Sequence, residues 1–156
     1  MTHQLAIDKH FMQQALEISQ SALPNCAPNP PVGCVITHQN ELLASGFTQS
    51  PGNPHAEASA LAALQQLDNN TQLKDLTAYV TLEPCSFVGR TPSCAKTLCD
   101  TGLFKRVVVA ILDPDPRNNG KGISCLKAAA IDVEIGLLEE KVKPFLAPYL
   151  LGGDAK

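Results

Sequence analysis

The chain has 156 residues, of which 12 are Lys or Arg and 15 are Asp or Glu, giving a formal net charge of −3 at pH 7. Because the basic residues are few and scattered, the composition argues against a nucleic-acid-binding face. No apolar run approaches the roughly 20 residues that a membrane-spanning helix needs, and the first residues lack the apolar stretch of a secretion signal. We therefore expect a cytoplasmic protein with a small-molecule partner and without a nucleic-acid or membrane partner.

The length suits a single domain, which we place at residues 1–150, followed by a disordered tail at residues 151–156. Six cysteines could in principle form three disulfides. A chain of this size without an export signal does not need such crosslinks, so we interpret the cysteines as reduced thiols.

The first half of the chain predicts one helix and one hairpin. Apolar residues at three-to-four spacing indicate an amphipathic helix over residues 8–23, which Pro24 ends. Asn29 then lies between two prolines, which favour an extended backbone and make its amide a candidate for contacting a ligand. Two β-type runs at residues 33–37 and 42–47 predict a hairpin with a four-residue loop.

The second half alternates predicted helices with predicted strands. Gly102 suits the left-handed position that closes a helix, and the apolar, β-branched run at residues 106–112 suits a strand covered on both faces. Such alternation predicts a layered α/β sheet. The expected helices are residues 55–67, 94–101 and 123–130, and the expected strands are residues 78–82, 106–112 and 131–135.

Four residues form a pattern that points to metal chemistry. His55 and Glu57 open a predicted helix, Cys85 follows a predicted strand after Pro84, and Cys94 begins the next helix. One imidazole and two thiols match a catalytic zinc site, which keeps its fourth position for water and lowers the pKa of that water. Glu57 suits a proton shuttle. This order of residues is the signature of zinc-dependent base deaminases, although eight residues, not two, separate the cysteines here.

A closed structural zinc site is the alternative interpretation. Cys99 or Cys34 would then supply the fourth ligand, and the chain would be a non-catalytic, zinc-stabilised interaction domain. A helix would turn Cys99 away from the face of Cys94, which lies five residues earlier. The spare carboxylate of Glu57 favours the catalytic interpretation.

The chain resembles the deaminase domain of the riboflavin-biosynthesis bifunctional deaminase/reductase, within the cytidine-deaminase-like superfamily. The resemblance runs from the first helix to about residue 150 and includes the eight-residue cysteine spacing. It implies a three-layer α/β/α fold with a central mixed five-stranded sheet. It also implies hydrolytic deamination of a diaminohydroxyphosphoribosylaminopyrimidine. The segments that carry it are residues 28–33, 55–57, 79–86, 89–94, 113–114 and 120–122.

The resemblance also implies roles for single residues. It assigns the zinc ligands, a proton-shuttling acid and three residues of the substrate pocket. The zinc ligands would be His55, Cys85 and Cys94, and the proton-shuttling acid would be Glu57. The pocket residues would be Asn29, Arg90 and Asp113.

Three pocket positions depart from the family pattern. Thr48 and Phe87 stand where the family usually has His, and Asp115 stands where it has Asn. Losing two donors and gaining a carboxylate should weaken phosphate binding. We therefore advance the hypothesis that the chemistry is kept while the substrate is altered, for example to another aminopyrimidine, a purine or a pterin.

Two features concern assembly. Helix faces rich in Ala and Leu, and the apolar run at residues 145–151, suggest a surface covered by another subunit, so we expect a homodimer or homotetramer. The family continues into a reductase domain after the point where this chain ends.

Overall fold

The computed structural model describes residues 2–67, 73–86 and 93–150. At its centre lies a five-stranded sheet in the order β2-β1-β3-β4-β5. β1 pairs antiparallel with β2 and β3, whereas β3, β4 and β5 run parallel, so the sheet is mixed, as predicted. The strands are β1 (Gly33–His38), β2 (Glu41–Phe47), β3 (Leu76–Leu82), β4 (Phe104–Ile111) and β5 (Asp132–Ile135).

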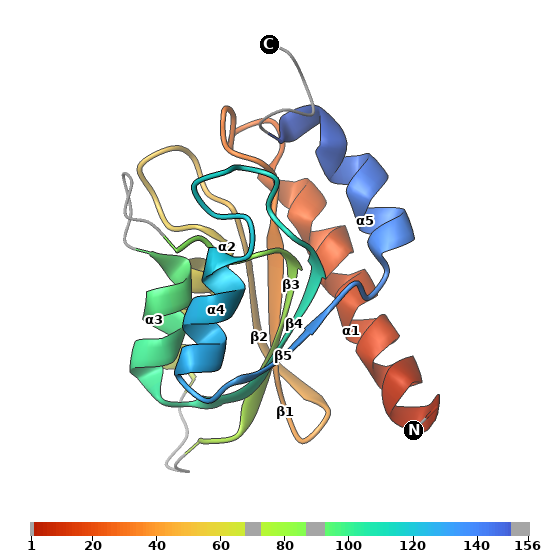
Figure 1. Cartoon of the computed structure of the whole chain (residues 1–156), viewed down its shortest axis with the longest axis vertical. Coiled ribbons are helices and arrows are strands. Elements are labelled where there is room, and N and C mark those ends of the chain that lie inside the picture. The colour runs from red at the N-terminus through yellow and green to blue at the C-terminus, as the bar shows by residue number, and fades with distance from the viewer. Residues whose placement is uncertain (1, 68–72, 87–92, 151–156) are drawn as a thin grey trace.

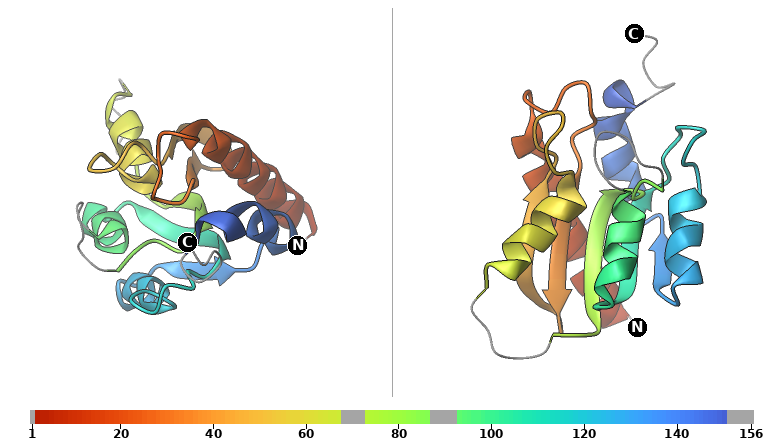
Figure 2. Two further views of the ribbon diagram at one scale, coloured as in Figure 1. Left: turned by 90° about the horizontal axis from the view of Figure 1, so that it is seen from above. Right: turned by 90° about the vertical axis from the view of Figure 1, so that its left-hand side faces the viewer.

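Helices cover both faces of the sheet, which confirms the predicted α/β/α sandwich. α1 and α5 lie on one face, and α2, α3 and α4 lie side by side on the other (Figures 1 and 2). The N-terminal ends of α2 and α3 meet the carboxyl end of β3 at one edge of the sheet (Figure 2). The helices are α1 (Thr2–Ser19), α2 (Ala56–Gln65), α3 (Cys94–Thr101), α4 (Lys121–Ala128) and α5 (Glu139–Leu146), with short 3-10 turns at Gln20–Ala22 and Ala147–Tyr149.

The core fills the space between the sheet and both helical layers. Residues 107–110 of β4 are completely buried, as predicted for a strand covered on both faces. One polar cluster lies under α1: the Asp8 carboxylate accepts a hydrogen bond from the Tyr79 hydroxyl at 2.7 Å and another from Arg106 Nη1 at 3.0 Å. Within the described part of the chain, no helix is long and apolar enough to cross a membrane.

The hairpin turn and the first helix differ from their predictions. The hairpin turn contains two residues instead of four, because Gln39 and Asn40 both adopt positive φ (52° and 65°) and His38 pairs with Glu41. Two left-handed residues form the tight turn whose twist matches a hairpin. The first helix begins at Thr2 and not at residue 8.

The apolar run at residues 145–151 packs in part against the protein's own core. This run overlaps α5, whose residues Val142 and Leu146 are completely buried against the protein's own core. Leu150 is buried as well. Tyr149 of the same run is exposed, and the expected homodimer or homotetramer stays a prediction. Residues 151–156 lie outside the described residues.

Candidate metal centre

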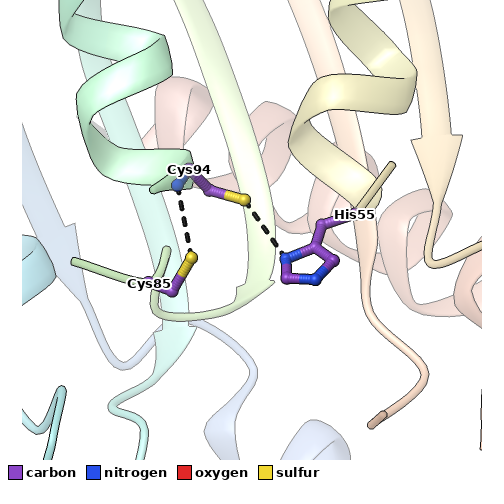
Figure 3. Close-up of side chains that lie close together, drawn as sticks. All are labelled: His55, Cys85 and Cys94. Atoms are coloured by element: carbon purple, nitrogen blue, oxygen red, sulfur yellow. Dashed lines mark hydrogen bonds between the residues drawn. The ribbon is translucent and has the colours of Figure 1, made fainter. Parts of the chain in front are cut away.

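Three side chains from three segments converge at the edge of the sheet where β3 ends. His55 is the N-cap residue of α2, Cys94 is the first residue of α3, and Cys85 lies in the loop after β3. One ligand atom from each lies within 4.8 Å of the others, and the three side chains point toward one another (Figure 3). Cys94 Sγ is 3.4 Å from His55 Nδ1. The structure thus brings together the trio predicted from the sequence.

The N-terminal end of α3 fixes the position of Cys85. The Cys94 N–H donates to Cys85 Sγ at 3.2 Å (Figure 3). The Cys85 carbonyl accepts from the Ala95 N–H and from the Ser93 hydroxyl, both at 2.9 Å. Ser93 also caps α3, because its hydroxyl accepts the Lys96 N–H. The sulfur therefore lies against the amide dipoles of a helix start, where a thiolate is stabilised.

The electrostatics of the trio favour metal binding. Hydrogen bonding to Cys94, and then to His55, lowers the pKa of Cys85 to about 4 in spite of its burial. The same contact with Cys85 raises the pKa of Cys94, and burial adds to this effect. The hydrogen bond with Cys85 also raises the pKa of His55. One thiolate thus forms readily, and two sulfurs with one imidazole nitrogen are a donor set that suits zinc.

Glu57 lies buried beside this trio in the first turn of α2, with 4% of its surface exposed. Burial, followed by the negative charge of Cys85, raises the pKa of Glu57 to about 7. The Cys34 thiol is completely buried, and desolvation together with the charge of Glu57 raises its pKa. A carboxyl group with a pKa near neutrality can both accept and release a proton under ordinary conditions.

Neither proposed fourth ligand joins the trio. Among the described residues, the metal-binding group consists of His55, Cys85 and Cys94. Cys99 instead lies between α3 and α4, where its thiol contacts the Cys125 carbonyl at 3.7 Å. The geometry therefore fits an open, three-ligand site better than a closed structural site.

Two predicted pocket residues lie on the loops that flank β1 and β2. Asn29 is half-buried, and its backbone N–H donates to the Cys26 carbonyl at 2.8 Å. Thr48 is buried, and its hydroxyl accepts the Val32 N–H at 3.0 Å. The Thr48 N–H in turn donates to the Val32 carbonyl at 3.1 Å. Thr48 thus joins the two loops through its hydroxyl and its backbone N–H, both bonded to the Val32 backbone.

The two predicted acids of the loop after β4 have different surroundings. Burial raises the pKa of Asp113, whose carboxylate accepts the Asp115 N–H and the Asn118 side-chain amide. Asp115 pairs with Arg117, with 2.6 Å between Oδ2 and Nη2. This hydrogen bonding lowers the pKa of Asp115. The predicted pocket residues Phe87 and Arg90 lie outside the described residues.

Sequence reasoning missed two buried residues next to the site, Glu83 and Asn118. Glu83 is 3% exposed and Asn118 is completely buried. Both make hydrogen bonds that join the Cys85 loop to the loop after β4. The available signal was an acidic residue directly after an apolar strand, since a buried carboxylate requires partners.

Comparison with known proteins agrees with this geometry. The family described as "Cytidine and deoxycytidylate deaminase zinc-binding region" matches residues 5–111. Over 143 residues the chain is 43% identical to riboflavin biosynthesis protein RibD of Escherichia coli, covering 92% of this chain and 37% of that protein. Over 138 residues it is 39% identical to the diaminohydroxyphosphoribosylamino-pyrimidine deaminase of Buchnera aphidicola, covering 88% of this chain and 90% of that protein.

The solved structures agree as well. RibD of Acinetobacter baumannii superposes with a TM-score of 0.87 at 42% identity, covering 97% of this chain and 41% of that one. The chain thus spans well under half the length of the RibD proteins that it matches. With most of its length matched by the family and its fold shared with these relatives, the chain belongs to the cytidine and deoxycytidylate deaminase zinc-binding family.

Proposed function

We propose that the chain is a zinc-dependent deaminase that hydrolytically removes an amino group from diaminohydroxyphosphoribosylaminopyrimidine in riboflavin biosynthesis. The observation that carries the proposal is the convergence of His55, Cys85 and Cys94 beside the buried acid Glu57. The similarity to the Buchnera aphidicola deaminase, which this chain matches over 90% of that protein's length, supports the choice of substrate.

His55, Cys85 and Cys94 would hold the zinc. Their ligand atoms already lie together, and two sulfurs and one nitrogen form the N/S donor set that zinc takes. When bound, zinc supplies a Lewis acid that makes a water molecule nucleophilic near neutral pH. The hydrogen bonds from the start of α3 hold Cys85 in place for this task.

Glu57 would carry the protons of the reaction. Its carboxylate would take a proton from the attacking water, pass it to a ring nitrogen and then assist the departure of ammonia. A pKa of about 7 suits both halves of this task, because the group must act as a base and then as an acid. Its burial keeps bulk water from competing for the proton.

Asp113 and Asn29 would contact the substrate. Asp113 lies at the start of the loop after β4, where Asn118 orients its carboxylate through a hydrogen bond of 3.3 Å. The carboxylate of Asp115 is paired with Arg117 and so does not face a phosphate as an unbalanced charge. This pairing removes one of the three reasons for expecting an altered substrate.

The test is ammonia release from diaminohydroxyphosphoribosylaminopyrimidine by zinc-loaded protein, with zinc-stripped protein as the control. We expect release only from the loaded protein. Release from the dephosphorylated compound alone would favour an altered substrate, as expected from Thr48 in place of His. The Thr48 hydroxyl accepts a hydrogen bond from the Val32 backbone. No release from either compound, by protein that holds one zinc per chain, would refute the proposed substrate.

A further inference from the structure

The loop after β4 is tied at both ends to Glu83, which lies two residues before Cys85. Glu83 Oε1 accepts the N–H groups of Asp113 and Gly120, each at 3.0 Å. Its Oε2 accepts the Ile123 N–H, in the first turn of α4, at 3.1 Å. A buried carboxylate held by three converging backbone N–H groups keeps one geometry, since moving any of them would leave a charge poorly solvated.

Asn118 reaches out of the same loop to both sides of Cys85. Its Nδ2 donates to the Pro84 carbonyl at 3.2 Å, and its Oδ1 accepts the Ser86 N–H at 3.1 Å. The amide makes two further hydrogen bonds. Its Nδ2 donates to Asp113 Oδ2 at 3.3 Å, and its Oδ1 accepts the Gly122 N–H at 3.2 Å. Two donors and two acceptor positions are thereby satisfied, which is the full capacity of an amide side chain.

The close approach of α4 to the Cys85 loop depends on Gly122. A Cβ at this position would overlap the Pro84 carbonyl oxygen. Because Gly122 has no side chain, its N–H reaches Asn118 while α4 packs directly against the Cys85 loop.

From these contacts we propose that Glu83 and Asn118 are positioning residues that hold Cys85 and Asp113 in one fixed arrangement. Glu83 ties down the loop that carries Asp113, and Asn118 joins that loop to the residues on either side of Cys85. The role of Asp113 here rests on the proposed function. The role of Cys85 rests on the geometry of the metal centre alone.

Two variants test the two residues that hold this arrangement. Glu83→Gln replaces an acceptor oxygen with an NH2 group, so at least one of the three N–H groups loses its partner. We expect its zinc affinity, measured by competition with a chromogenic chelator, to fall about ten-fold, as for other groups that orient metal ligands. This readout requires no substrate.

Asn118→Asp tests the contacts with both Cys85 and Asp113. The new carboxylate still accepts the Ser86 and Gly122 N–H groups but places an oxygen against the Asp113 carboxylate and the Pro84 carbonyl. We expect its zinc affinity to fall about ten-fold, because Asn118 contacts the residues on either side of Cys85. We also expect the KM for the pyrimidine substrate to rise, because Asn118 orients Asp113. This variant also keeps the proposal testable if Glu83→Gln does not fold.

Tyr79→Phe is the matched control. It removes a buried hydrogen bond to Asp8 in the polar cluster under α1, which lies on the other face of the sheet from α3 and α4. It should lower the melting temperature while leaving zinc affinity and KM unchanged. If Glu83→Gln and Asn118→Asp lower the melting temperature in the same way and also leave both quantities unchanged, the positioning role is refuted.

The outcomes also separate this inference from the proposed function. If the parent protein releases no ammonia from the pyrimidine, the substrate assignment fails. The zinc affinities of the parent, Glu83→Gln and Tyr79→Phe proteins still decide whether Glu83 positions Cys85.

Discussion

Replacing Asp8 with Asn should destabilise the fold in a pH-dependent way. The Asp8 carboxylate is 4% exposed and accepts hydrogen bonds from Arg106, Tyr79 and Gln4. Asn has the same shape but carries no charge and has an NH2 group in place of one acceptor oxygen. The change therefore removes the ionic part of these contacts and at least one hydrogen bond. Arg106 keeps Glu134 as a second partner, with 2.8 Å between Nε and Oε2.

The size of the effect follows from these contacts. Hydrogen bonds to a charged group contribute about 1.5–3 kcal/mol each, and neutral ones about 1 kcal/mol. Losing the difference at the Arg106 and Tyr79 contacts with Asp8 gives a decrease of about 1–4 kcal/mol in the free energy of unfolding. For a domain of this size, that lowers the melting temperature by about 2–16 °C.

The pH dependence supplies the second half of the prediction. Burial alone would raise the pKa of Asp8, but the hydrogen bonds from Arg106, Tyr79 and Gln4 outweigh it and hold the pKa below its ordinary value. A lowered pKa contributes stability that is present above the unfolded-state value of about 3.9 and is lost as the pH falls through the folded-state value. The difference between parent and variant should therefore shrink as the pH falls below about 4.

Urea denaturation of both proteins from pH 7 to pH 3 measures this difference directly, and equal m-values would show that the unfolded states match. A variant as stable as the parent at pH 7, or a deficit that stays constant down to pH 3, would refute the reasoning.

Three further predictions concern the site and its supports. Chelating the metal should lower the melting temperature and abolish ammonia release, and added zinc should restore both; a thermal scan unaffected by the chelator would contradict this. Gly122→Ala should cost about 1–3 kcal/mol in urea denaturation, because its Cβ would overlap the Pro84 carbonyl. Arg117→Ala should raise the KM for the phosphorylated substrate, most strongly at low salt, because it leaves the charge of Asp115 unbalanced. Adding Asp115→Asn to this variant should reverse the rise in KM. KM values measured across a salt series check both expectations, and an unchanged KM for Arg117→Ala at low salt would contradict them.

Local signals in the sequence predicted the elements that depend on local chemistry. α3 begins at Cys94 and ends at Thr101 as expected, because Ser93 caps its start and Gly102, with φ of 67°, closes its end. α5 was not predicted, because Pro144 lies inside it and proline normally breaks a helix pattern.

The metal ligands were predictable for a similar reason. His55, Cys85 and Cys94 are residue types with a distinctive chemistry at a distinctive spacing, and each lies at an element boundary that the sequence marks. Asn118 carries no such mark, and the signal for Glu83 is limited to its place directly after an apolar strand. Their partners are mainly backbone groups, 30 to 40 positions away for Glu83 and 32 or more for the contacts of Asn118 with Pro84 and Ser86. Only the packing of α4 against the Cys85 loop brings them into contact.

Thr48 and Asp115 make contacts that a family resemblance does not reveal. As departures from a family pattern they suggested a changed pocket, but the contacts that their side chains make could not be read from the pattern. Thr48 bonds to the Val32 backbone, and Asp115 bonds to Arg117 within its own loop.

The central claim is that Glu57 moves protons beside a metal held by His55, Cys85 and Cys94. The most direct measurement compares the rate of ammonia release by zinc-loaded parent protein with that of the Glu57→Gln variant at equal zinc content. Gln keeps the size of the side chain but cannot accept and release a proton, so the rate should fall by about 10²–10⁴-fold. A variant that binds one zinc per chain and keeps the full rate would contradict the account.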